Sequence, residues 1–187
     1  MIASEHRHSS DSPLGGEVAR CAESSLVRIA RSEEYGEIGR VTQAAWREFA
    51  RPGDPVWDAY FELLGDAERR AQRAVLLVAV LAGSVAGAAT VELDTTIEDG
   101  GVLEPEQANF RMLAVDPRRR GRGVGRLLID ACLAQARAAG KTVATLHTVA
   151  DMAAGLRLYH SFGFVRDEAR DVAITPGLTL LAYRLPL

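Results

Sequence analysis

The chain has 187 residues, of which 48% are hydrophobic and 25% are charged, and its formal net charge at pH 7 is −3. That length is enough for one well-buried domain and too short for two of ordinary size. A mildly acidic chain is a poor match to a protein that tracks a nucleic-acid backbone. The longest apolar stretch, residues 74–82, is too short to cross a bilayer, so we expect no membrane partner.

The N-terminal segment differs in composition from the rest of the chain. Residues 1–24 are rich in Ser, Glu, Gly and His and show no hydrophobic period. This predicts a disordered lead followed by one domain at residues 25–187. The segment lacks the apolar core of a signal peptide, so a cytoplasmic location is expected. Cys21 and Cys132 form no metal or redox motif, and no metal site is predicted.

Hydrophobic periodicity in the first half of the chain predicts three strands and two helices. The strands are expected at residues 26–30, 75–81 and 85–93, the last two joined by a tight Ala-Gly-Ser turn. Ser32 is expected to cap the first helix, with two acidic residues in its first turn, and apolar residues recur at helical spacing as far as Phe49. Asp54 and Pro55 are residue types that start a helix, here the second one.

The second half of the chain alternates strands with helices. An acidic loop at residues 94–108 leads to strands at 109–115 and 143–148, helices at 124–138 and 152–162, and a terminal hairpin of strands at 172–174 and 178–185. Gly140 and Gly163 are expected to end the two helices, and Asp151 to cap the second. Strands that alternate with helices and finish in a hairpin predict a mixed α/β fold.

The turn at residues 116–126, Asp-Pro-Arg-Arg-Arg-Gly-Arg-Gly-Val-Gly-Arg, is the most informative segment. Its three glycines let backbone N–H groups approach a ligand, and the helix behind adds the positive end of its dipole, which suits a phosphate or pyrophosphate. Arg126 and Leu127 stand where a P-loop needs Lys and Ser or Thr, and the third glycine of a dinucleotide fingerprint is also missing. The arginines at 118–122 also fit a nucleic-acid patch, but the chain has no second basic stripe, so no nucleic-acid partner is expected.

Three motifs together resemble those of the GNAT family of acyl-CoA-dependent N-acetyltransferases. They are Arg-Gly-Arg-Gly-Val-Gly at residues 120–125, Arg-Met-Leu-Ala-Val at 111–115, and Leu-Tyr-His-Ser-Phe-Gly-Phe at 158–164. The resemblance runs from about Leu26 to the C-terminus. It implies a mostly antiparallel central sheet flanked by helices, with a V-shaped splay between the fourth and fifth strands. It also implies acetyl-CoA as co-substrate and an amine as acceptor.

The resemblance assigns the acetyl-CoA contacts to two segments. Main-chain groups at the end of the fourth strand would pair with the pantetheine and acetyl end, and amides of the glycine turn would hold the pyrophosphate. The expected cofactor-binding residues are Leu113, Ala114, Val115, Arg120, Gly121, Arg122, Gly123, Val124, Gly125 and Arg126. The side chains at 113–115 serve as core residues in either case.

Tyr159 aligns with the general acid of the family, close to the thioester sulfur. A phenol has a pKa of about 10, above that of a thiol, so hydrogen bonding to the sulfur is an alternative to full proton donation. Packing beside Phe162 and Phe164 is the structural alternative for this side chain.

Two positions depart from the common family pattern. Met152 stands where an asparagine often contacts CoA, although Leu146, Thr148 and Met152 match the Leu-x-Thr-x-x-x-Met pattern of a subset of relatives. Asn109 stands where relatives often have glutamate, so a carboxylate base is missing there. The remaining base candidates are Glu92, Asp94, Glu104, Glu106 and His147, of which His147 and Glu92 come first; a water relay with no side-chain base is the alternative.

The acceptor itself is left open by the sequence. The first two helices, the loop at 94–108 and the terminal hairpin are the segments that the resemblance assigns to acceptor binding. Acidic residues of the loop, among them Glu98 and Asp99, favour a cationic amine, although loop acids are usually solvated. A small amine, an amino acid and a protein N-terminus all fit, and a non-catalytic acyl-CoA sensor is the rival function. The oligomeric state is equally open, and a homodimer is compatible with the sequence.

Overall fold

The computed structural model describes residues 25–50, 53–94, 103–175 and 178–187. The predicted disordered lead at 1–24, and Glu98 and Asp99 of the acidic loop, lie outside these residues. Within them, no helix is long and apolar enough to span a bilayer.

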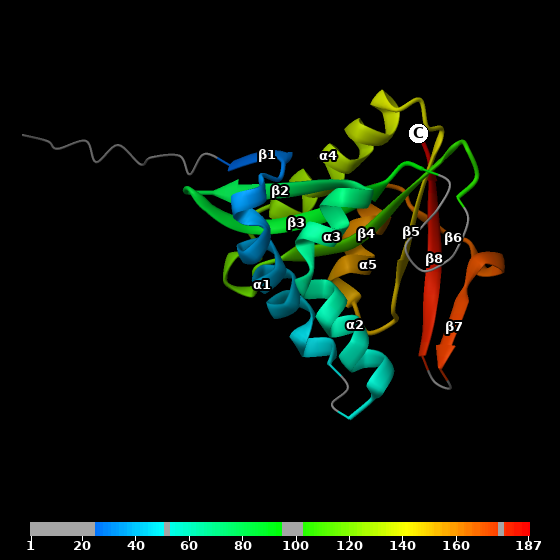
Figure 1. The fold of residues 1–187 in the computed structure, drawn as a ribbon. Coiled ribbons are helices and arrows are strands. Elements are labelled where there is room, and N and C mark those ends of the chain that lie inside the picture. Colours follow the sequence, from blue (N-terminus) through cyan, green and yellow to red (C-terminus); the bar gives the residue numbers. More distant parts are fainter. Residues whose placement is uncertain (1–24, 51–52, 95–102, 176–177) are drawn as a thin grey trace, which may run out of the picture.

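An eight-stranded mixed sheet forms the centre of the fold (Figure 1). Its strands are β1 Ser25–Ile29, β2 Val75–Leu81, β3 Ser84–Glu92, β4 Gln107–Val115, β5 Val143–Thr148, β6 Val165–Arg166, β7 Val172–Thr175 and β8 Leu178–Pro186. The order is β1-β2-β3-β4-β5-β8-β6, with β7 paired to β8. β4 and β5 run parallel, whereas the other pairs are antiparallel. The mixed, mostly antiparallel α/β fold expected from the sequence is therefore confirmed.

Helices cover both faces of the sheet. They are α1 Tyr35–Trp46, α2 Pro55–Gly65, α3 Ala67–Arg73, α4 Val124–Ala138 and α5 Ala153–Ser161. Alternate residues of β2 enter two different cores: Leu77 and Ala79 pack with α4 and α5, and Leu76 and Val78 pack with α1 and α3. A strand covered on both faces needs apolar residues at successive positions, which explains the continuous apolar run of β2.

The fourth and fifth strands separate part of the way along their length. β4 pairs with β5 from Gln107 opposite Val143 to Phe110 opposite Leu146, and no pairing follows, although both strands continue. The register between β3 and β4 shifts near this point, because β4 carries one extra residue. Met112, in this bulge of β4, has φ +48°, which is a strained conformation for a bulky side chain. The predicted splay is therefore present, and a bulge in β4 accompanies it.

Helix ends follow local signals in most cases. Asp54 caps α2 as predicted, with Oδ1 accepting a hydrogen bond from the N–H of Val56 at 2.9 Å. Gly140 and Gly163, at φ +73° and +89°, follow the last turns of α4 and α5 and close them with backbone bonds, as predicted. The cap at Asp151 is wrong, because α5 begins after Met152.

The first helix starts differently from the prediction. Ser32 lies inside a short 3₁₀ helix rather than capping α1, and Arg31 is the capping residue. The backbone N–H of Arg31 donates to Glu34 Oε2 at 2.8 Å, so a glutamate side chain at the third position supplies the cap. Two elements were not predicted, α3 and β6, and β4 starts two residues earlier than expected, inside the stretch assigned to a loop.

We predict opposite effects for Gly36→Ala and Gly39→Ala, although both replace a glycine in α1. A Cβ at Gly36 would have nothing within 4 Å, so alanine should raise the free energy of unfolding by up to about 1 kcal/mol. A Cβ at Gly39 would run into the carbonyl oxygen of Gly65 in α2, so the same change there should lower it by roughly 1–3 kcal/mol. Urea denaturation of the two variants measures the difference. Equal effects would mean that α1 and α2 separate freely.

Candidate functional site

The glycine turn ends in the N-terminus of α4. Gly123 is the N-cap residue of α4 at φ +79°, and no side chain caps the helix. Gly121 has φ +77°, and a Cβ at either glycine would meet nothing within 4 Å. The first N–H groups of α4 have no acceptor within the helix. Open space, the amides at the helix start and the helix dipole are features that suit an anion such as a phosphate.

Gly125 has a different role from the two glycines before it. A Cβ at this position would lie 3.1 Å from Leu158 Cδ2 on α5 and 3.7 Å from Val115 Cγ2 at the end of β4. The missing side chain therefore lets α4, α5 and β4 pack closely just behind the turn. Leu113, Ala114 and Val115 complete β4 here, where the strand pairs with β3 and has no β5 partner among the described residues.

Several arginines of the turn bind protein groups rather than forming an open basic patch. Arg120 forms an ion pair with Glu48 at 2.7 Å and donates to the carbonyl oxygen of Ala45 at 3.3 Å, at the end of α1. Arg119 donates to the carbonyl oxygen of Leu81. The Arg120 side chain thus leads away from the turn and anchors it to α1.

The ends of the turn are held in the same way. The guanidinium of Arg118 lies 2.8 Å from Asp116 Oδ2, and it holds the pKa of that carboxyl below its usual range. Arg126 donates to Ser161 Oγ at 3.1 Å, and its guanidinium lies 4.8 Å from the centre of the Phe162 ring. Arg122 and Val124 complete the predicted set, Arg122 exposed on the turn and Val124 buried at the first position of α4.

Tyr159 lies in the apolar core between α5 and the sheet. Its ring packs against Phe164 with centroids 6.0 Å apart, and it passes close to Gly155, where an added Cβ would lie 3.5 Å from the ring. Burial raises the pKa of Tyr159 to about 12. In the part of the chain that the structure describes, its hydroxyl has no hydrogen-bond partner. The phenol is therefore protonated at neutral pH, and its O–H group can donate a hydrogen bond to a ligand.

The Thr148 and Met152 motif has a direct structural basis. The hydroxyl of Thr148, at the end of β5, donates to Met152 Sδ at 3.6 Å. A sulfur is a weak acceptor, but this contact joins the last residue of β5 to the start of α5. The two side chains therefore set the position of the helix that carries Tyr159.

Glu92 lies on the opposite face of the sheet, within a polar chain that crosses three strands. Its Oε2 accepts from Asn109 Nδ2 at 2.7 Å, and its Oε1 lies 3.2 Å from Arg111 Nη1. Thr145, on β5, donates to Asn109 Oδ1 at 3.2 Å. A carboxylate thus lies beside Asn109 after all, but β3 supplies it. Both its oxygens accept hydrogen bonds.

A cavity of about 180 Å³ lies on the same face, along β4 and β5. Its lining residues are Leu103, Gln107, Asn109, Thr145, Leu146, His147, Asp167, Arg170, Val172, Ala182 and Tyr183. His147 Nε2 lies 3.1 Å from the carbonyl oxygen of Arg170. A carbonyl oxygen can only accept, so Nε2 carries the hydrogen in this contact, and no residue that the structure describes donates to Nδ1.

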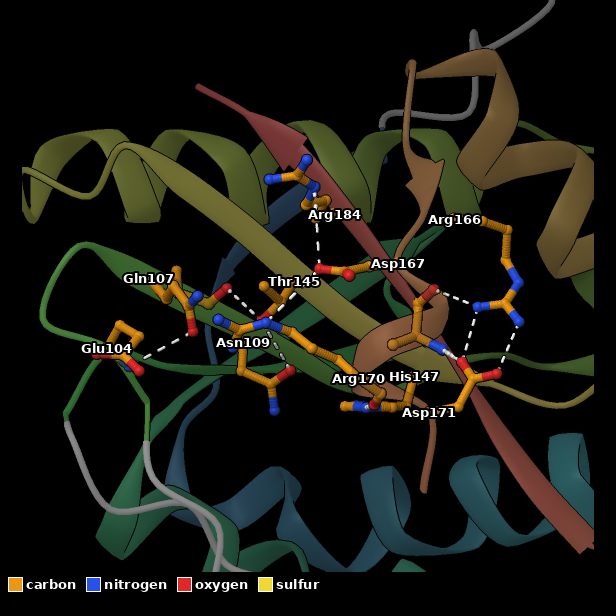
Figure 2. A network of polar contacts seen from close by, with 12 residues as sticks. Glu104, Gln107, Asn109, Thr145, His147, Arg166, Asp167, Arg170, Asp171 and Arg184 are labelled. Atoms are coloured by element: carbon orange, nitrogen blue, oxygen red, sulfur yellow. Dashed lines mark hydrogen bonds and ion pairs between the residues drawn. The ribbon is translucent and has the colours of Figure 1, made fainter. Parts of the chain in front are cut away.

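Three ion pairs hold the outer wall of the cavity in place (Figure 2). Arg166 Nη1 lies 2.7 Å from Asp171 Oδ1, which also accepts from the N–H of Ala182 at 2.8 Å. These bonds lower the pKa of Asp171 to about 2, so the carboxylate stays ionised at neutral pH. Asp167 lies between Arg170 and Arg184, at 3.6 and 3.8 Å. The wall between β6 and β7 therefore rests on paired charges.

The structure divides the predicted catalytic residues between the two faces of the sheet. Tyr159 lies on the α5 face, and Glu92 and His147 lie on the other face. β4 and β5 separate beyond Phe110 and Leu146, directly before His147 on β5. The other base candidates, Asp94, Glu104 and Glu106, are exposed. Within the described residues, no group of three or more potential metal ligands is brought together.

Sequence reasoning missed most of the cavity. Gln107 was assigned to a loop, and its place on β4 follows only from pairing with β5. The wall residues Arg166, Asp167 and Asp171 carried no motif, because their partners lie on β8 or on the same short segment. A carboxylate opposite Asn109 was also hidden, since register between strands is not visible in one sequence.

The comparisons with known proteins agree on one family. The profile of the family described as "Acetyltransferase (GNAT) family" matches residues 38–164. The chain is similar to the PaiA N-acetyltransferase of Thermoplasma acidophilum in complex with coenzyme A, with 12% identity, a TM-score of 0.68 and coverage of 88% of this chain and 99% of that one. No curated protein sequence matches the chain.

Two further solved structures lead to the same family. An N-acetyltransferase from Staphylococcus aureus Mu50 has 20% identity, a TM-score of 0.62 and coverage of 87% of this chain and 98% of that one. A GNAT family acetyltransferase from Brucella melitensis, solved with acetyl-CoA, has 26% identity, a TM-score of 0.56 and coverage of 88% of each chain.

Proposed function

Because this chain belongs to the acetyltransferase (GNAT) family, we propose that it moves the acetyl group of acetyl-CoA directly to a primary amine. The observation that carries this proposal is the open glycine turn at the start of α4, next to the unpaired end of β4. The turn offers amides to the pyrophosphate, and the free edge of β4 at Leu113, Ala114 and Val115 offers backbone groups to the pantetheine. The cytoplasmic location expected from the sequence stays a prediction.

The proposed reaction needs three things from the protein. The amine nitrogen attacks the thioester carbonyl, the new N–C bond forms, and the C–S bond breaks with the electron pair leaving on sulfur. A proton must leave the nitrogen, and the thiolate takes up a proton. The amine therefore has to be neutral when it attacks, and a donor near sulfur lowers the barrier.

Tyr159 is the proposed donor to sulfur. With a pKa of about 12, the phenol stays protonated, but its pKa lies well above that of an ordinary thiol, about 8.5. Full proton transfer is therefore uphill, and a hydrogen bond that strengthens as charge grows on sulfur fits the site better. The apolar surroundings strengthen such a bond because little water competes for it.

His147 is the proposed acceptor of the amine proton, directly or through water. Its Nε2 is held by the Arg170 carbonyl, so Nδ1 is left as the basic atom. Glu92, the other candidate, already accepts hydrogen bonds from Asn109 and Arg111 with both oxygens. We therefore assign Glu92 to holding the acceptor side of β4 in place. The same occupied oxygens favour the rival reading, a sensor that binds acetyl-CoA without turnover.

We predict that Gly123→Glu abolishes acetyl-CoA binding, whereas Gly140→Glu retains it. Both glycines have positive φ and open space, so the backbone strain and the added charge are matched at the two ends of α4. Only at 123 does the carboxylate occupy the proposed pyrophosphate position, against the helix N-terminus. Calorimetric titration with acetyl-CoA measures both. Wild-type affinity in Gly123→Glu would place the pyrophosphate elsewhere.

Tyr159→Phe should lower kcat by roughly tenfold to a thousandfold while changing the affinity for acetyl-CoA little. The ring keeps its packing, so the loss belongs to the transition state. Thiol release over an amine panel gives the rates. Tyr35→Phe removes a phenol hydroxyl beside the other core, outside the proposed mechanism and the cavity, and is the matched control; it should keep kcat. An unchanged kcat in Tyr159→Phe would make Tyr159 a packing residue only.

His147→Gln should lower kcat/KM by roughly 10²-fold or more at neutral pH, because glutamine can still donate to the Arg170 carbonyl but has no basic nitrogen. His160→Gln, on the exposed side of α5, is the control and should leave kcat/KM unchanged. Steady-state rates for both variants decide the point. A rate within twofold of wild type in His147→Gln would assign deprotonation to solvent. Absence of thiol release by the wild-type protein with every amine would favour the sensor.

A further inference from the structure

The cavity beside His147 is long in the direction of the strands. His147 lies just past the point where β4 and β5 separate, and Gln107 lies at the other end, on the first residue of β4. Phe110, the last residue of β4 that pairs with β5, lies three positions after Gln107. At a rise of about 3.3 Å per residue, this is a distance of about 10 Å. A molecule that reaches both ends must have two functional groups several bonds apart.

Gln107 offers a hydrogen-bond donor at one end of the cavity. The residue is only 7% exposed, and its Oε1 accepts a 3.4 Å hydrogen bond from the N–H of Glu104. Nothing in the described part of the chain accepts a hydrogen bond from its Nε2. Because Nε2 is not fully buried and lines the cavity, it is open to a ligand that supplies an acceptor.

The charges of the cavity wall favour an anion. Asp167 is the one acid among the lining residues, and it is shared between two arginines, Arg170 and Arg184, so this cluster carries one excess positive charge. The nearby Asp171 is bound to Arg166. Among the lining residues that the structure describes, no carboxylate lacks a positive partner, whereas a bound carboxylate would meet both an amide donor and a guanidinium. Figure 2 shows these side chains around the same part of the sheet.

The remaining lining is apolar, apart from the hydroxyl of Tyr183. It includes Leu103, Val172 and Ala182, and a volume of about 180 Å³ suits a group of the size of one amino acid. A short chain of methylene or peptide groups could pack against these side chains while its two ends meet the polar residues.

We propose that this cavity binds the carboxylate of the amine acceptor, with Gln107 and Arg170 as its donors and the amine placed at the gap between β4 and β5. The acceptor is then an amino-carboxylate in which several bonds separate the two groups, such as an ω-amino acid or a short peptide. This inference rests on the proposed transferase function, since it names the acceptor class of the same site. It departs from the cationic acceptor that the acidic loop favoured.

Three acceptors of equal length test the proposal: 6-aminohexanoate, 6-aminohexanamide and hexylamine. For the wild-type protein we expect kcat/KM for the carboxylate to exceed that for the amide and the alkylamine at least tenfold. Gln107→Glu keeps the shape and the acceptor for Glu104 but adds a negative charge, so the preference should fall at least tenfold, through KM. Gln135→Glu makes the same change on α4, away from the cavity, and should keep the preference.

Arg170→Gln provides a second variant, since its backbone carbonyl still holds His147; it too should reduce the preference. Equal kcat/KM for 6-aminohexanoate and 6-aminohexanamide, or a preference untouched by both cavity variants, would overturn the proposal. Calorimetric titration of 6-aminohexanoate into the protein saturated with CoA separates the two hypotheses. If the wild-type protein binds 6-aminohexanoate but acetylates no amine, and Gln107→Glu does not bind it, the transferase function is wrong and the carboxylate site stands. If the protein acetylates amines without preferring the carboxylate, the transferase function stands and the carboxylate site is wrong.

Discussion

The separation of β4 from β5 is the constraint on which the rest of the molecule depends. Two parallel strands that are paired along only part of their length leave the backbone groups beyond Phe110 and Leu146 without each other as partners. Buried backbone groups must be paired, so the free edge of β4 either reaches solvent or accepts a ligand that has its own amides. The bulge at Met112 bends the strand at this point, and its positive φ is tolerated because β3 and the core hold the strand on the other side.

Local signals could be read from the sequence, and contacts between distant segments could not. Asp54, Gly123, Gly140 and Gly163 act within one or two turns of chain, and each has the role that its residue type indicated. The motif at 146–152 was also visible, but its reason, the Thr148 to Met152 contact, was not. The mixed α/β fold followed from the alternation of patterns.

The features that the sequence did not reveal depend on strand register or on charged partners. Glu92 lies beside Asn109 only because β3 and β4 align those two residues. Arg120 is expected at the ligand, and its side chain here pairs with Glu48 and a carbonyl oxygen at the end of α1, contacts that no local pattern indicates. Ser32 does not cap α1. Glu34 accepts a hydrogen bond from the N–H of Arg31 and forms an ion pair with Arg28, so the helix starts at a different residue. In each case a charged partner outweighed a local preference.

The two faces of the sheet give the proposed reaction two environments of different polarity. On the α5 face, Tyr159 is buried among apolar side chains, which raises its pKa and keeps it a neutral donor. On the other face, His147 lies among amides, hydroxyls and paired charges that water can reach. A thiolate formed next to Tyr159 is poorly solvated, so a single well-placed hydrogen bond has a large effect there. An amine must lose its proton before it attacks, and that step needs the polar face. In the proposed reaction, the separation of β4 and β5 would let acetyl-CoA place its sulfur on the apolar face while the acceptor amine approaches from the polar face.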